Sequence, residues 1–175
     1  MNESLYFIAI VPPVEIQNEI TEFKHEIANR FGSRHALNAP AHITLHMPFK
    51  WKEKKMEQLH HVIRECNEQL NPFELTLRGF DYFEPRVIFV KVESNVQLDL
   101  LQGTVVDNCR RTLKLDNGNY KSQGFHPHVT IGFRDLKKPM FFRAKQEFEN
   151  RHYASVFTVK DIQLLQHDGK RWNIY

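Results

Sequence analysis

The sequence contains little cysteine, little glycine and no long run of apolar residues. Only two of its 175 residues are cysteines, Cys66 and Cys109, and they stand singly within helix-like segments. They lack the clustered spacing of a disulfide framework and the Cys-x-x-Cys pairs of a zinc site. We therefore predict a reducing, cytoplasmic location.

The shortness of the apolar runs argues against a membrane helix. The first run covers residues 5–11 and is broken by Pro12 and Pro13, whereas a spanning helix needs about 20 apolar residues. No basic leader precedes that run, so we predict neither secretion nor membrane insertion. With 7 glycines, 8 prolines and no dominant residue type, disordered and fibrous classes are excluded as well.

Basic and acidic side chains are nearly balanced. The 24 basic and 21 acidic side chains give a net charge of +3, which is too mild for a duplex-DNA binder and suits a small anionic ligand. Apolar residues make up 41% of the chain, which is close to ordinary globular usage. We expect one domain, or two small lobes that share a core, because about 80 residues alone barely sustain one.

What the sequence does contain is a repeated order of predicted elements. In the first half, the spacing of apolar residues predicts strand, helix, strand, helix and strand over residues 5–11, 14–31, 41–49, 53–70 and 73–83. The second half repeats this order over residues 86–92, 96–115, 126–133, 139–151 and 155–166. Asp168 and Gly169 form a predicted two-residue turn before a last strand at 171–175.

This repeat indicates an internal duplication. His128 follows His42 by 86 positions, and Phe157 follows Phe73 by 84, so corresponding elements keep similar offsets. We predict an α+β fold made of a single domain with two interleaved lobes, approximately residues 1–84 and 85–175. A pseudo-two-fold axis relates the lobes, two antiparallel β-sheets face a central cleft, and the helices lie on the outside.

Both halves carry a His-x-Thr motif in a strand-like run. The first lies in "AHITLHMPF" and the second in "FHPHVTIGF". Side chains alternate across a strand, so His42 and Thr44 share one face, and His128 and Thr130 likewise share one. The apolar residues between them must pack under the helices. If a two-fold axis relates the lobes, the histidine and threonine side chains of both motifs point into the same cleft.

This pattern suits phosphoester chemistry. In-line displacement at phosphorus has an entering oxygen that loses a proton and a leaving oxygen that gains one, on opposite sides of the phosphorus. Histidine is the side chain best placed to do either near neutral pH. Each threonine hydroxyl can donate to a non-bridging phosphate oxygen. The set needs neither a metal nor another cofactor.

The paired motifs and the duplicated order resemble the 2H phosphoesterase superfamily, which includes 2′-5′ RNA ligase-like proteins and 2′,3′-cyclic nucleotide phosphodiesterases. The resemblance covers nearly the whole chain. It implies that His42 is the general acid, that His128 activates water, and that Thr44 and Thr130 hold the phosphate. The implied enzyme is a monomeric, metal-independent hydrolase of 2′,3′-cyclic phosphates at RNA ends or in small nucleotide derivatives.

Other residues near the motifs are candidate substrate contacts. Family members often carry a basic residue soon after the second motif, and Arg134 stands one position later than in that pattern. In an unbroken strand it would turn to the histidine face, so the departure favours hydrolysis of a small phosphodiester over RNA ligation. Phe49 and Phe125 are candidates for stacking on a base. His46 and His126 continue the same alternation, so they too could face the cleft, but each flanks the end of a strand and we expect them to support the site from behind or to be exposed to solvent.

Two other classes of function stay open. A non-catalytic module could bind RNA or a nucleotide in the same cleft. A metal-dependent hydrolase could use His126 and His128, with His42 as a third ligand, although no Asp, Glu or Cys accompanies them in either motif. Turnover of a cyclic phosphate in EDTA would separate these possibilities.

Overall fold

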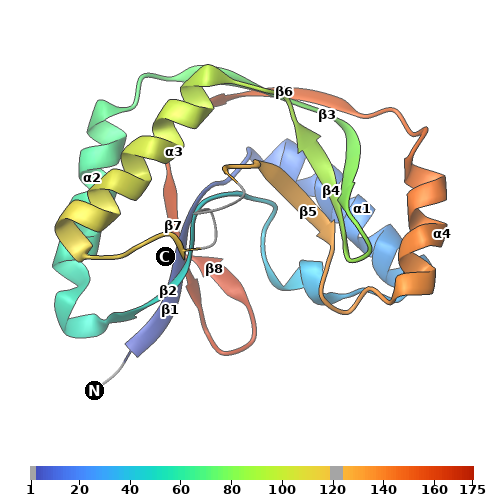
Figure 1. Ribbon diagram of the computed structural model, residues 1–175, viewed down its shortest axis with the longest axis horizontal. Helices are drawn as coiled ribbons and strands as arrows, with labels where there is room; N and C mark the ends of the chain where they lie inside the picture. The colour runs from blue at the N-terminus through green and yellow to red at the C-terminus, as the bar shows by residue number, and fades with distance from the viewer. Residues whose placement is uncertain (1–2, 119–123) are drawn as a thin grey trace.

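Two antiparallel four-stranded sheets make up the centre of the computed structural model, which describes residues 3–118 and 124–175 (Figure 1). Sheet A has the order β2 (Ile43–Lys52), β1 (Glu3–Ile10), β7 (Gln163–His167) and β8 (Trp172–Ile174). Sheet B has the order β5 (His128–Gly132), β4 (Val87–Val92), β3 (Phe73–Phe83) and β6 (Ala154–Val159).

Two pairs of helices flank the sheets. The helices are α1 (Val14–Phe31), α2 (Met56–Gln69), α3 (Val96–Asn108) and α4 (Lys138–Phe148). Short helical turns occur at η1 (His35–Asn38), η2 (Glu53–Lys55) and η3 (Cys109–Leu113). Figure 1 shows α2 and α3 together on one side and α1 and α4 on the other. The predicted α+β class, with antiparallel sheets and outer helices, is confirmed.

Helix α1 forms where the sequence predicts it. Pro13 precedes its first residue, and Gly32 ends it with φ 77° and a bond from its N–H to the Ala28 carbonyl, which is the usual glycine stop. The stripe that α1 buries contains Ile20 and Ile27. Lys24 also lies in that stripe, although lysine is almost never buried without a partner.

One hydrophobic core fills the space between sheets and helices. On β1, Tyr6, Ile8 and Ile10 point into it, and on β5 Val129 and Ile131 do the same. The alternate residues of these strands therefore lie on the opposite face of each sheet. We call that opposite face the motif face, because it carries the His-x-Thr residues. On sheet A it holds the small cluster of Phe7, Ala9 and Leu165.

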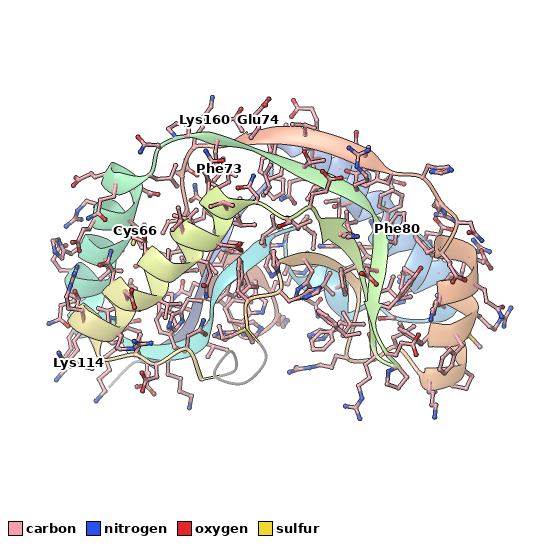
Figure 2. All side chains as sticks on the ribbon, turned by 45° about the horizontal axis from the view of Figure 1, so that its top comes forward. Cys66, Phe73, Glu74, Phe80, Lys114 and Lys160 are labelled. Carbon is pink, nitrogen blue, oxygen red and sulfur yellow. The ribbon has the colours of Figure 1, made fainter. Side chains whose placement is uncertain are left out.

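Strand β3 is long and spans both helix pairs. Its pairing with β4 shifts between Leu77 and Phe80, and Gly79 between them has φ 66°, a conformation that favours glycine. Figure 2 shows Phe73 at the end of β3 nearer α3 and Phe80 on the side of α1. The figure also shows Cys66 on α2, whose sulfur accepts a hydrogen bond from Asn108 of α3 at 3.3 Å.

The C-terminal third differs from the prediction in two places. The segment 155–166 is not one strand: β6 pairs with β3 in sheet B, and β7 pairs with β1 in sheet A. The hairpin turn is shifted by one residue, because the Asp168 N–H donates to the Arg171 carbonyl and leaves Gly169 and Lys170 at the tip. Each sheet therefore contains strands from both halves of the sequence. The duplication itself stays a prediction.

Among the described residues, every helix is too short or too polar to cross a lipid bilayer. Both cysteines are buried and unpaired.

Candidate active site

The two motif strands lie at the seam between the sheets. Strand β2 is an edge of sheet A and β5 is an edge of sheet B, and the two strands contact each other. His42 is the residue just before β2, and His128 is the first residue of β5. The fold therefore brings together two motifs that are far apart in the sequence.

His42 is held by its own backbone segment and by an aromatic ring. Its Nδ1 atom lies 2.7 Å from the carbonyl oxygen of Pro40. Its ring centroid is 4.7 Å from that of Phe7 on β1. Because a carbonyl can only accept, Nδ1 carries the hydrogen in this bond. The Nε2 atom of the neutral ring is then left as an acceptor.

His128 repeats this arrangement in the second motif. Its Nδ1 atom lies 2.8 Å from the carbonyl oxygen of His126, again two residues earlier. Its ring lies 5.0 Å from the rings of both Phe83 and Phe89. Each motif therefore supports its histidine on phenylalanine and leaves Nε2 as the acceptor. This matched orientation is what an acid and base pair requires.

The motif threonines share the faces of their histidines. Thr44 is directly opposite Ala9 of β1, which belongs to the cluster that contains Phe7. Thr130 is directly opposite Phe89 of β4, which contacts the His128 ring. Cross-strand partners lie on the same face of a sheet, so both hydroxyl groups lie on the motif face.

Burial makes both histidines weak bases. It lowers the pKa of His42 to about 4, and the positive charges of Lys24 and His128 act in the same direction. Burial also lowers the pKa of His128, with a smaller effect from His126. Without a ligand, both imidazoles are therefore neutral at pH 7. Because the charge of His128 also acts on His42, a charged group bound between the two motifs would act on the His42 ring.

Two register shifts in the pairing of β2 with β1 determine where His46 and Phe49 lie. Strand β1 pairs Ile8 with His46 and the next residue with Thr44, so Leu45 is an extra residue that inverts the alternation. His46 is consequently buried in the core rather than on the motif face. A second register shift between Ile8 and Tyr6 restores the alternation, so Phe49 pairs with Tyr6 and lies in the core, only 8% exposed. Phe49 has the same parity as Ile43, so strand alternation alone already places it on the core side. Its burial argues against the predicted contact with substrate.

Arg134 does not continue strand β5. The pairing of β5 with β4 shifts at Ile131, and the strand ends at Gly132. Arg134 then takes φ 66° in a tight turn closed by a bond from the Asp135 N–H to the Phe133 carbonyl, 2.8 Å. Its guanidinium lies 6.0 Å from the Phe133 ring centroid. The parity argument for Arg134 therefore fails.

The two candidates nearest the second motif differ in exposure. Phe125 is half-buried and packs against the hydrophobic core. His126 is exposed, with its ring 5.1 Å from that of Phe83. Substrate contact by Phe125 or Arg134 stays a prediction.

Several residues around the motifs were not singled out from the sequence. Phe7 and Phe89 support the two histidines, and the Trp172 ring lies 4.6 Å from that of Phe7. The residues Phe7 and Phe89 alternate with core residues of their strands, which is a usable signal. Trp172 follows a turn, and only the pairing of β8 with β7 places it.

The three-histidine metal site is not formed. No group of three His, Cys, Asp or Glu side chains in residues 3–118 and 124–175 has the geometry to hold a metal ion. Two shallow hollows, of about 270 and 390 Å³, lie away from the motif residues. One is next to His60 and Tyr175 and the other is next to Arg78 and Arg151.

A family comparison now identifies the chain. Residues 12–171 match the model of a family described as the 2′-5′ RNA ligase superfamily. The chain belongs to the 2′-5′ RNA ligase superfamily. This confirms the resemblance to the 2H phosphoesterases that the two motifs indicate.

Two relatives of this superfamily member align along almost its whole length. A protein of Geobacillus sp. (strain WCH70), named provisionally as a phosphoesterase, is 29% identical over 97% of this chain and 92% of its own. A relative from Geobacillus thermodenitrificans (strain NG80-2) with the same provisional name is 27% identical over the same shares. The superfamily and these names support an enzyme of the phosphoesterase type.

Solved structures share the fold of this superfamily member. E. coli LigT in its apo form has a TM-score of 0.68 and 18% identity, and the match covers 100% of this chain and 95% of LigT. LigT complexed with 3′-AMP has a TM-score of 0.69 and 20% identity, covering 99% and 95%. A protein of Thermus thermophilus has a TM-score of 0.67 and 20% identity, covering 97% and 94%.

Proposed function

We propose that this chain is a phosphodiesterase that hydrolyses 2′,3′-cyclic phosphates, at RNA ends or in small nucleotide derivatives, with His42 and His128 as its acid and base. The observation that carries the proposal is the matched pair of histidine hydrogen bonds. Each Nδ1 binds a carbonyl oxygen two residues earlier, at 2.7 and 2.8 Å. Each Nε2 is therefore directed away from its own backbone.

The chemical step balances with these two groups. His128 takes a proton from water as the water oxygen forms a bond to phosphorus. The bond between phosphorus and one ribose oxygen breaks, and His42 gives that oxygen its proton. The product is a phosphate monoester with a free ribose hydroxyl. The resemblance to the 2H superfamily supports this assignment of the two roles.

Both imidazoles are neutral at pH 7, with their one proton on Nδ1, so the acid must acquire a second proton on Nε2. The pKa of His42 lies at about 4 in the free protein. A bound phosphodiester carries a negative charge, and a nearby opposite charge favours the protonated imidazole. We therefore infer that His42 is protonated together with substrate binding. Thr44 and Thr130 would donate hydrogen bonds to the non-bridging oxygens.

Aromatic side chains beside the histidines supply candidate contacts for the nucleoside. Phe83 is 38% exposed and lies beside both His126 and His128. Trp172 lies beside Phe7, the ring that supports His42. Base stacking on aromatic rings tolerates any base. E. coli LigT has been solved with 3′-AMP and with ATP, which supports a nucleotide as the ligand here.

In ligation a 5′-hydroxyl group would replace water: His128 would take its proton as its oxygen bonds to phosphorus, and His42 would give a proton to the leaving ribose oxygen. The family description supports a 2′-5′ RNA ligase-like activity as the second candidate. A monomeric state and a cytoplasmic location also remain proposals.

The test is hydrolysis of 2′,3′-cyclic nucleotides in the presence of EDTA, with products separated as 2′- and 3′-monophosphates. We expect one monophosphate to accumulate at a rate that EDTA does not change. Loss of turnover in EDTA that added metal restores would contradict the two-histidine mechanism. Tight binding of the nucleotide without any ring opening would instead indicate a binding module. Joining of RNA ends without hydrolysis would favour the ligase.

A further inference from the structure

The segment just before His42 is bonded at each of its three residues. The Ala39 carbonyl accepts a hydrogen bond from Lys24 Nζ at 2.9 Å. The Pro40 carbonyl holds His42 Nδ1. At Ala41, the N–H donates to Gln17 Oε1 at 2.8 Å and the carbonyl accepts from Gln17 Nε2 at 2.5 Å. Two of these three anchors are side chains of α1.

Lys24 and Gln17 reach this segment from one face of α1. They are seven residues apart, which is close to two helical turns and places them on the same side. Lys24 itself is only 3% exposed. Burial lowers its pKa to about 8, so the ammonium form still predominates at pH 7. The position is costly, because a buried ammonium here has a neutral carbonyl as its partner.

The charge on Lys24 acts on His42. Among the described residues, the charged groups that act on the His42 ring are Lys24 of α1 and His128 of β5, and both disfavour its protonated form. The neighbour from β1 is the apolar ring of Phe7. A neutral donor could supply the hydrogen bond to the Ala39 carbonyl, but it would not carry a charge. A charged one beside an ionisable imidazole also changes its titration.

The second motif is not built in this way. His128 has the same bond to a carbonyl two residues earlier, but the charge that acts on it within the described part of the chain is that of His126. Lys24 and Gln17 therefore distinguish the environment of one histidine from that of the other.

We propose that Lys24, together with Gln17, is a positioning residue for His42 that acts through the backbone segment Ala39–Ala41. This inference rests on the proposed function of His42. Gln17 fixes the peptide groups on both sides of Ala41, and the first of these carries the Pro40 carbonyl that binds Nδ1. Lys24 fixes the preceding carbonyl and adds a positive charge. That charge delays protonation of His42 until an anionic substrate arrives.

The test measures the ring directly and does not depend on activity. The imidazole signals of His42 and His128 are followed by ¹H–¹⁵N NMR from pH 8 to about pH 3, because the pKa of His42 lies at about 4, and His42→Gln assigns the first. In Lys24→Gln, which keeps a hydrogen-bond donor but removes the charge, we expect the His42 titration to move up by about 0.5 to 1 unit. The His128 titration should stay where it is. An unchanged His42 titration would overturn the role of the Lys24 charge.

Further variants separate charge from geometry. Lys24→Met removes both the charge and the donor, and it should shift His42 in the same direction as Lys24→Gln. If Lys24→Met fails to fold, Lys24→Gln still decides the question. Gln17→Leu keeps the charge but releases Ala41, so kcat for a 2′,3′-cyclic nucleotide should fall about tenfold or more while the pH dependence of the rate stays where it is. Full activity in Gln17→Leu would overturn its positioning role.

Failure of the proposed function would be recognised separately. If wild-type protein opens no cyclic phosphate but Lys24→Gln still shifts the His42 titration, the positioning arrangement stands and the reaction is wrong. If wild-type protein is active and the titration does not respond, the reaction stands and the inference about Lys24 is wrong.

Discussion

His42 and His128 are held in the same way: each imidazole donates from Nδ1 to the carbonyl oxygen two residues earlier. The bond fixes the tautomer as well as the orientation, because only a protonated nitrogen can bind a carbonyl. The two rings are also close enough that the charge of His128 affects His42. Their equivalence therefore extends from the sequence motif to the tautomer and the orientation of each ring.

Removing either histidine should abolish most turnover and leave the fold intact. In His42→Ala and His128→Ala we expect kcat for a 2′,3′-cyclic nucleotide to fall by about two to four orders of magnitude, the usual size of a lost general acid or base. His25→Ala, on the exposed side of α1, is the matched control and should keep full activity. Thermal unfolding checks the fold. A variant that unfolds would mean that its histidine is structural.

The pH at which kcat/KM is highest should lie on the acidic side of neutrality. A bell-shaped profile of kcat/KM reports the acid and base of the free enzyme, and the pKa values of His42 and His128 both lie below the ordinary 6.5. The maximum lies between the two, so we expect it below pH 6.5. The rate should then fall as pH rises, because the acid loses its proton. Steady-state rates from pH 4 to 9 measure this, and a maximum above pH 7 would contradict it.

Phe83 and Phe49 should respond to truncation in opposite ways. Phe83 is exposed beside His128, so Phe83→Ala should raise KM for the nucleotide several-fold with little effect on unfolding. Phe49 is buried in the core, so Phe49→Ala should lower the free energy of unfolding by about 3 kcal/mol. Urea unfolding and steady-state kinetics on both variants make the comparison. An unchanged KM in Phe83→Ala would exclude this ring from substrate binding.

Arg134 sits in a backbone conformation that favours glycine. Its φ of 66° costs a side chain about 1 kcal/mol, so Arg134→Gly should not lower the melting temperature. If the guanidinium contacts substrate, the same variant should raise KM, and a smaller salt dependence of KM should accompany the change. Arg86→Gly, a change of another exposed arginine, is the control. Equal KM values in the two variants would remove Arg134 from the site.

Most secondary-structure elements were predictable because their periods are clear. Helix α1 was expected at 14–31 and forms there, since Pro13 and Gly32 mark its ends. The pairing of strands was harder, because it depends on contacts between distant segments. The predicted strand at 155–166 is the example: β6 and β7 are adjacent in sequence and belong to different sheets. Local periodicity does not distinguish one long strand from two short ones.

The site was predictable as far as strand alternation holds. His42, Thr44, His128 and Thr130 were found by parity and lie on the motif faces. Parity failed at Leu45, where a bulge turns His46 into the core, whereas Phe49 is on the core side that parity gives it. No local sequence pattern predicts such a bulge.

The role of Lys24 could not be predicted from the sequence, for a different reason. It lies four residues after Ile20 and three before Ile27, within the stripe that α1 buries. A charged residue at that spacing was the available signal. Its use, however, depends on the segment before His42, which only the folded chain brings to α1.

The central claim is tested most directly by a crystal structure with inorganic phosphate or a non-hydrolysable 2′,3′-cyclic phosphate analogue. We predict that one phosphoryl group is bound between the Nε2 atoms of His42 and His128, with the hydroxyl groups of Thr44 and Thr130 donating to its oxygens. An anion that binds elsewhere, or Nε2 atoms too far apart to reach one phosphoryl group, would contradict it.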